Sequence, residues 1–153
     1  LSFLTHGYCF ILFVRFIVFF FAWFLFSLIV YFSMYLHLVF RKELLELYKI
    51  YSEGLYGYSK DMRKALSYLK PLVEEENGYA CLLYGKVLTD SGSPFCNEFM
   101  GVKCLRIACE SGCGEAFYVL GKLHETGFGV VKDRALAEKM FAKASEHGYD
   151  PKR

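Results

Sequence analysis

The sequence predicts an all-α protein: a stack of about three helix–turn–helix repeats, preceded by an apolar N-terminal helix. Three observations lead to this fold class. Chemically matched residues return every 36 positions after residue 60. Within the repeats, apolar residues recur three and four positions apart, which is the spacing of one helix face. Residues 1–40 hold a single charged side chain, Arg15, whereas the rest of the 153-residue chain is ordinarily charged.

The first element is a hydrophobic segment at residues 1–41. It has no charged residue over the 25 positions from Phe16 to Phe40. As a helix rising about 1.5 Å per residue, such a run covers the ~30 Å hydrocarbon core of a bilayer. Arg41 and Lys42 follow directly, and the positive-inside tendency places the domain after them in the cytoplasm. We therefore expect a single-pass membrane anchor through residues 16–40.

Alternatives to an anchor stay open. A cleaved signal peptide usually has a shorter apolar core and a small-residue cleavage site, and neither is visible here. A buried core helix is a further alternative. The chain begins with Leu, so residues 1–33 are alternatively translated DNA upstream of a start at Met34. In that case we expect a cytoplasmic protein.

The second region, residues 42–153, carries the repeats, at about 44–78, 79–114 and 115–149. The 36-residue period links Asp61, Asn97 and Asp133. It also links Ala65, Gly101 and Ala137; Leu69, Leu105 and Phe141; Leu72, Ala108 and Ala144; and the pairs Ala80 and Ala116, Gly85 and Gly121, and Gly112 and Gly148. A single hairpin cannot bury both its apolar faces, so successive hairpins must stack.

Each repeat is predicted to hold two helices. In the first repeat they cover about 42–52 and 60–73, and Pro71 is expected to kink or shorten the second. In the middle repeat they cover about 79–89 and 97–110, with a turn at 90–94. In the last repeat, glycines at 127 and 129 end the first helix. Asp133 then opens the second helix, because its carboxylate can accept from free backbone N–H groups. The inward faces of these last two helices are Ala116, Phe117, Leu120 and Leu123, then Ala137, Met140, Phe141 and Ala144.

The last repeat resembles a Sel-one-like repeat. Residues 120–133 read LGKLHETGFGVVKD, and Ala137, Phe141, Ala144 and Gly148 follow. The family pattern is L-G-x-x-Y-x-x-G-x-G-V-x-x-D-x-x-x-A, then an aromatic residue, an Ala and a Gly. Here His124 replaces the first aromatic residue. The middle repeat has Ser91-Gly92-Ser93-Pro94 in place of the G-x-G-V turn and Gly101 in place of the Ala. The first repeat has Tyr48 in place of the Gly and one extra turn residue.

The resemblance covers roughly residues 44–149. It implies a right-handed α-α superhelix related to tetratricopeptide arrays, and a non-enzymatic adaptor that binds a protein or peptide partner. In that geometry the first helix of each repeat lines a concave groove, and a mixture of aromatic, Lys and Glu residues suits a peptide or helix ligand. The candidate groove residues are Tyr79, Leu82, Lys86, Thr89 and Asp90 in the middle repeat, and Glu115, Tyr118, Lys122, Glu125 and Thr126 in the last. The alternative for each of them is a solvated face that binds nothing.

Other functions are not expected from the residues. The net charge of +2 comes without a basic stripe, which disfavours nucleic-acid binding. No phosphate loop, nucleophile elbow or paired carboxylate motif occurs, so we expect neither a catalytic site nor a cofactor. The cluster of Cys104, Cys109 and Cys113 lacks a C-x-x-C pair and a nearby His, so no metal site is expected. His124 is interpreted as a packed core residue, and His147 as a partner of free helix carbonyls.

The six cysteines, which include Cys9 in the apolar segment, are irregularly spaced and are expected to be free thiols; a disulfide in the cluster stays open. The alternative function is a secreted Sel-one-like hydrolase of the β-lactam-binding kind, with disulfides between repeats. The resemblance implies that some secreted members staple each repeat with two Cys separated by seven intervening residues. Phe117 stands eight positions after Cys109, so that signature is missing. A third possibility is a fragment of a longer array, because no clear polar cap follows the last helix.

Overall fold

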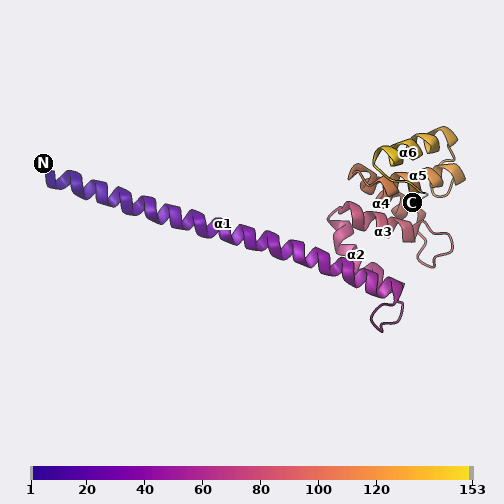
Figure 1. Cartoon of the computed structure of the whole chain (residues 1–153), viewed down its shortest axis with the longest axis horizontal. Coiled ribbons are helices and arrows are strands. Elements are labelled where there is room, and N and C mark those ends of the chain that lie inside the picture. The colour runs from indigo at the N-terminus through magenta and orange to yellow at the C-terminus, as the bar shows by residue number, and fades with distance from the viewer. Residues whose placement is uncertain (1, 152–153) are drawn as a thin grey trace. The chain divides into compact units, whose positions relative to one another are not determined.

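The computed structural model describes residues 2–151, with side chains described at 15, 16 and 19–151. This part of the chain is all-α (Figure 1), as predicted. The helices are α1 (Ser2–Glu53), α2 (Met62–Glu74), α3 (Gly78–Leu88), α4 (Glu98–Glu110), α5 (Gly114–Thr126) and α6 (Arg134–Glu146). The chain divides into two compact units, with the boundary between Glu43 and Leu44.

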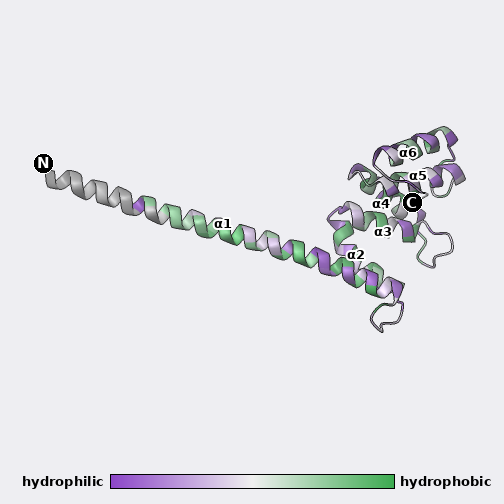
Figure 2. Ribbon diagram, viewed as in Figure 1, coloured by the Kyte–Doolittle hydropathy of each residue, from purple (hydrophilic) through white to green (hydrophobic). Residues whose placement is uncertain are grey.

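The unit before Leu44 consists only of the part of α1 that precedes the boundary. Figure 2 shows a long hydrophobic stretch along this helix. The stretch Phe19–Glu53 is long and apolar enough to cross a membrane, and none of its most apolar window is buried. Large aromatic side chains of this stretch are exposed: Phe19 is 73% exposed and Trp23 is 67% exposed. A helix that exposes so much apolar surface needs a covering from outside itself.

The last turns of α1 form the first helix of the first repeat. A separate helix over 42–52 was expected, but α1 runs through these positions without a break. No Gly or Pro occurs between residues 41 and 53 that would end it. From this stretch, Leu44 and Tyr48 are buried in a cluster with Leu69 of α2 and Ala80 of α3. Tyr48 occupies the position that corresponds to Gly85 and Gly121 in the other repeats once the extra turn residue is allowed for.

The later helices pair as the repeats predict. Helix α3 packs against α4, and α5 packs against α6 beside it (Figure 1). Small residues let the paired helices approach. A Cβ on Gly85 would lie 2.8 Å from the Leu105 side chain, and one on Gly121 would lie 2.7 Å from the Phe141 ring. The 36-residue period links Gly85 with Gly121 and Leu105 with Phe141. The period therefore marks equivalent helix–helix contacts in the two repeats.

The second helix of every repeat begins with the same cap. Asp61, Asn97 and Asp133 have extended backbones, and each side-chain Oδ1 accepts from the backbone N–H three residues later, at 3.0, 3.1 and 2.9 Å. The backbone N–H of the same three residues donates back to Tyr51, Leu88 and His124, at 2.8, 2.9 and 2.9 Å. The hydrogen bond from Asp61 spans one residue more than those from Asn97 and Asp133. The difference is the extra turn residue of the first repeat seen in the sequence.

The second helices also end alike. Residues 76, 112 and 148 have positive φ angles of 56, 78 and 76°. The next residues, Asn77, Cys113 and Tyr149, donate to Leu72, Ala108 and Ala144 at 2.9, 3.1 and 2.9 Å, which closes the helix end. The expected effect of Pro71 on helix length is wrong. With 13 residues, α2 is as long as α4 and α6. Pro71 lies in the last turn, where little of the helix remains to be broken.

Candidate functional site

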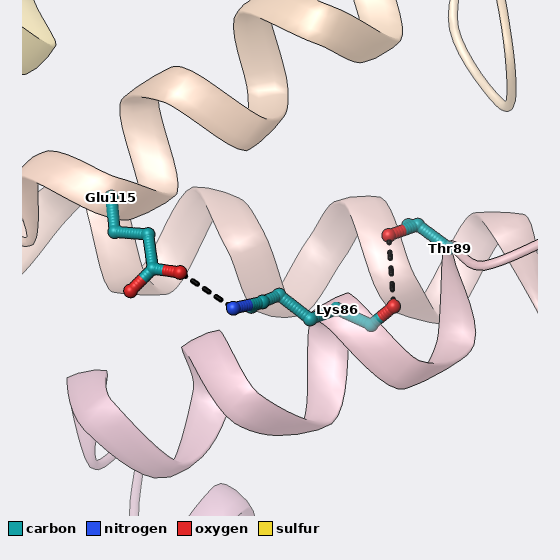
Figure 3. Close-up of polar contacts among 3 residues, drawn as sticks. All are labelled: Lys86, Thr89 and Glu115. Atoms are coloured by element: carbon teal, nitrogen blue, oxygen red, sulfur yellow. Dashed lines mark hydrogen bonds and ion pairs between the residues drawn. The ribbon is translucent and has the colours of Figure 1, made fainter. Parts of the chain in front are cut away.

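The best-defined polar contact on the first helices is an ion pair between α3 and α5. The Nζ of Lys86 lies 2.5 Å from Oε1 of Glu115 (Figure 3). The two side chains are 45% and 31% exposed. The hydrogen bond that Lys86 donates to Glu115 is the main cause that raises the pKa of Lys86, and partial burial opposes it. The pair therefore presents a fixed positive and negative charge on a surface made by two successive repeats.

An aromatic cluster lies further along α5. The Tyr118 ring is 5.4 Å from the Phe141 ring of α6 and 5.3 Å from the ring of Tyr149, centroid to centroid. Lys122 lies one turn later, with its Nζ 5.7 Å from the centre of the Tyr118 ring. Cations are attracted to the face of an aromatic ring at this range. The cluster thus combines apolar surface with a positive charge.

A pocket opens beside this cluster, and we call it the end pocket. Its volume is about 300 Å³. It is lined by Tyr118, Lys122, Glu125, Phe141, Ala144, Ser145, Tyr149 and Pro151. Three of the ten candidate groove residues therefore lie in this pocket at the end of the last repeat.

Of the other candidates, Tyr79 is 49% exposed at the start of α3. Thr126 is exposed, and its hydroxyl donates to the carbonyl of Lys122 at 3.0 Å. We call five exposed or half-buried residues of α3 and α5 the first-helix strip. It consists of Tyr79, Lys86, Glu115, Tyr118 and Lys122.

Three candidates in the middle repeat have structural roles. Leu82 was expected to face the groove, and this is wrong: it is 1% exposed and lies in the core. Thr89 is half-buried at the end of α3, where its hydroxyl donates to the Gly85 carbonyl at 2.8 Å. Asp90 is exposed, and its Oδ1 accepts from the N–H of Gly92 at 3.0 Å, which shapes the turn.

The reason for the error at Leu82 is the next repeat. The α5 residues Ala116, Leu120 and Leu123 belong to the same buried cluster as Leu82. The flank of a first helix that looks open within one hairpin is therefore covered by the following hairpin. The pocket residues that sequence reasoning missed are Phe141, Ala144, Ser145, Tyr149 and Pro151. The 36-residue period could have indicated these pocket residues. The residues 36 positions before them lie at the junction with α5.

The two histidines behave differently. His124 is buried, and its Nδ1 lies 3.1 Å from the Val131 carbonyl, so it is a packed core residue as predicted. His147 was expected to interact with free helix carbonyls, and its backbone N–H donates to the Lys143 carbonyl at 3.0 Å. Its ring stacks on Phe117, 5.1 Å between centroids and 14° between planes, which was not expected.

Burial protects the thiols of Cys81, Cys104 and Cys109 from ionisation by raising their pKa. Cys81, Cys96, Cys104, Cys109 and Cys113 are free, and Cys9 lies outside the residues whose side chains are described. Burial raises the pKa of Cys81 to about 11 and that of Cys109 to about 12. A protonated thiol is a poor nucleophile and a poor metal ligand. Over the described residues, no group of three or more His, Cys, Asp or Glu side chains is placed to hold a metal ion.

Comparison with known proteins agrees with this geometry. The family model described as Sel1 repeat matches residues 49–74 and 114–149. These matches cover the first and last repeats. The middle repeat, which departs from the pattern at its turn and at Gly101, has the same caps and helix pairing. No curated protein sequence matches the chain.

Two solved structures have a similar fold. A Sel1 repeat protein from Oxalobacter formigenes is 26% identical with a TM-score of 0.60, and the match covers 69% of this chain and 79% of that one. A protective antigen present in uropathogenic Escherichia coli strains, which displays an SLR fold, is 21% identical with a TM-score of 0.61. That match covers 71% of this chain and only 23% of the antigen.

The period, the repeated caps and these matches lead to one assignment. This chain carries Sel1 repeats at residues 49–74 and 114–149, and its helical stack has the fold of a solved Sel1-repeat protein.

Proposed function

We propose that the chain is a non-enzymatic adaptor, tethered to a membrane by α1, that binds a protein or peptide partner through the first-helix strip. Sel1 repeats generally mediate protein interactions. The observation that carries the proposal is the composition of the strip. Exposed Tyr79 and half-buried Tyr118 flank the Lys86–Glu115 pair, so aromatic surface and fixed charges of both signs lie on one face. Tyr is enriched among the residues that dominate binding energy at protein interfaces, and complementary charges add specificity.

The thiols support a binding role over an enzymatic one. Each cysteine whose pKa departs from its usual value is shifted upward by burial, as at Cys81, Cys104 and Cys109. A catalytic thiol needs a lowered pKa. The free state of Cys109 and Cys113 also favours the adaptor over a disulfide-stapled secreted hydrolase. The chain's near-neutral charge favours a protein or peptide ligand over nucleic acid.

Charge and exposure support the membrane tether. The helix stretch from Phe19 onward exposes its apolar side chains, and lipid tails are the covering that needs no matching protein surface. Arg41 and Lys42 follow the apolar run, against Arg15 before it. The positive-inside tendency then places the repeats in the cytoplasm.

Partner binding is tested by affinity capture with the full chain in detergent and quantitative mass spectrometry. The informative variant exchanges the ion pair, Lys86→Glu with Glu115→Lys, because it keeps a salt bridge but reverses the charges that a partner meets. Tyr79→Ala removes the exposed aromatic ring. Both are expected to lose a shared set of proteins that Arg106→Glu, on exposed α4 surface, retains. Equal capture by all variants would contradict the strip.

The tether is tested separately by carbonate extraction of cell membranes. An Arg at the centre of a spanning helix costs about 2.5–3.5 kcal/mol. The double variant Phe24→Arg, Ile29→Arg is therefore expected to move the protein from the membrane pellet to the soluble fraction. Phe99→Arg, an exposed position in the repeats, is the control and should stay in the pellet. A mature N-terminus at Met34, measured by mass spectrometry, would contradict an anchor through residues 16–40.

A further inference from the structure

One face of α1 carries hydroxyl groups inside the apolar run. Ser27, Tyr31 and Tyr35 are spaced by four residues, so each lies only about 40° around the helix from the one before it. Of the four hydroxyl side chains from residue 16 to residue 40, only Ser33 lies off this face. Among the described residues, none of the three side chains forms a hydrogen bond. We call Ser27, Tyr31 and Tyr35 the polar stripe.

The depth of Tyr31 in a bilayer makes its hydroxyl group costly. Residue 28 is halfway along the run from Phe16 to Phe40, so Tyr31 lies about 4.5 Å from the middle at about 1.5 Å per residue. The hydrocarbon core extends ~15 Å to each side. Long side chains of a helix lean toward its N-terminus, so the Tyr31 ring leans toward the middle of the core and away from its nearer edge. The hydroxyl group therefore needs a hydrogen-bond partner inside the hydrocarbon.

The helix itself does not supply that partner. A Ser hydroxyl can bond to a carbonyl in the preceding turn of its own helix. The hydroxyl of Tyr31 stands at the far end of a ring that is 74% exposed, away from the backbone of α1. Lipid tails offer no acceptor. A second helix that brings a hydroxyl group to this face would satisfy Tyr31.

The polar stripe also has a recess near its centre. Between residues 19 and 38, Ser27 is the one side chain that is not exposed, and Trp23 and Tyr31 beside it are far larger. Small residues let two helices in a membrane approach closely. Ser27 is next to the middle of the apolar run, so two helices that cross there keep both ends of their runs in the bilayer.

A second copy of α1 fits both the recess and the hydroxyl groups. In a two-fold symmetric pair the same patch lies on both helices and must complement itself. Ser and Tyr hydroxyl groups both donate and accept, so the stripe of one copy can satisfy the stripe of the other. No Asp, Glu, Lys or Arg lies between residues 16 and 40 to make two copies repel each other. The self-complementary chemistry favours a second copy over a helix of different sequence.

We propose that two copies of the chain pair in the membrane along the polar stripe. The helices cross at Ser27, and Tyr31 of each copy forms a hydrogen bond with a hydroxyl group of the other. The inference rests on the membrane tether of the proposed function and deepens it. A paired chain carries two first-helix strips, so a partner with two binding segments would gain avidity.

The two serines of the apolar run give a matched cross-linking test. Ser33 follows Ser27 by six residues and lies about 120° around the helix from it. The full chain carries Cys9→Ser and Cys96→Ser, which remove the thiol of the apolar segment and the exposed thiol of the repeats. In cell membranes oxidised with copper phenanthroline, Ser27→Cys is expected to give a disulfide-linked dimer on non-reducing gels. Ser33→Cys is expected to stay monomeric.

Energy transfer in lipid vesicles measures the strength of pairing. Full chains with Cys9→Ser are labelled with donor or acceptor dye at exposed Cys96. Ser27→Phe fills the recess and should abolish energy transfer, whereas Ser33→Phe should retain it. Tyr31→Phe removes one hydroxyl group from each copy and should weaken pairing about three- to tenfold, as two interhelical hydrogen bonds would.

Each outcome decides the proposal. It is overturned by equal dimer formation from the two cysteine variants, by dimers from Ser33→Cys alone, or by no dimer from either. Energy transfer that survives both Ser27→Phe and Tyr31→Phe also overturns it. A cross-link from Ser27→Cys to another protein instead of a second copy would show a different occupant. Carbonate extraction separates the two proposals: an unpaired chain in the membrane pellet refutes the pairing and leaves the tether standing, whereas a chain in the soluble fraction refutes both.

Discussion

Lys86 of α3 and Glu115 of α5 stand 29 positions apart in the chain and meet at 2.5 Å. They come from successive repeats, so their contact exists only because the hairpins stack. The same pair supplies one positive and one negative charge of the first-helix strip. One structural relationship therefore links the repeat period to the proposed binding face.

Replacing both partners of this ion pair should cost little stability. Because the side chains are 45% and 31% exposed, we expect a coupling below about 1 kcal/mol in a double-mutant cycle of Lys86→Ala and Glu115→Ala. The measurement is urea unfolding of the full chain in detergent. A coupling of several kcal/mol would show that the pair holds the stack together.

The pH dependence of that coupling has a definite sign. The pKa of Lys86 is raised in the folded protein, chiefly by its hydrogen bond to Glu115. Its contribution is fully present below the unfolded Lys pKa of about 10.4 and is lost as the pH rises through the folded pKa. Repeating the cycle at neutral and at strongly alkaline pH checks this. A coupling that is unchanged at alkaline pH would contradict it.

Removing the cap of α6 should be costly, whereas changing its charge should not. In Asp133→Ala, the N–H of Leu136 loses its acceptor, and we expect a loss of about 1 kcal/mol of unfolding free energy. Asp133→Asn is the matched control, because Asn97 caps α4 with the same geometry. Equal losses in the two variants would mean that charge, and not the hydrogen bond, is the important property.

Adding a methyl group between paired helices should also destabilise the fold. In Gly121→Ala the new Cβ would lie 2.7 Å from the Phe141 ring, and overpacking of this kind costs about 1–3 kcal/mol. Gly92→Ala is the control, because its nearest neighbour would be 3.5 Å away at Asp90. Thermal unfolding of both variants is the measurement. A neutral Gly121→Ala would imply that α5 and α6 pack less closely than described.

The thiols should react in the order of their exposure. Cys96 is exposed, whereas Cys81 and Cys104 are buried, and burial raises the pKa of Cys81 to about 11. Under native conditions at pH 8, a maleimide should label Cys96 first and Cys81 only after unfolding. Peptide mass spectrometry gives the rate at each site. Failure of the denatured protein to label Cys109 or Cys113 would reveal a disulfide and favour the secreted alternative.

Much of the fold could be predicted because short-range chemistry repeats. Asp61, Asn97 and Asp133 cap helices through bonds three residues long, so the sequence alone indicates them. The glycines at 85 and 121 likewise mark close approach. Pro71 misled because its effect depends on how much helix follows it, and here only three residues do.

The candidate site was less predictable because it depends on contacts between repeats. Leu82 and Tyr118 occupy equivalent positions, yet one is buried and the other lines a pocket. Only the helix that covers Leu82 makes the difference. The ring of His147 likewise stacks on Phe117, a partner 30 residues away that no local pattern indicates.

The most direct test of the binding face is site-specific photo-cross-linking in living cells. A p-benzoylphenylalanine group placed at position 79, on the first-helix strip, is compared with one at position 106 on α4. We predict a discrete cross-linked partner from position 79 that disappears when Lys86 and Glu115 are exchanged, and none from position 106. Adducts from position 106 alone, or adducts from position 79 that persist after the exchange, would contradict the account.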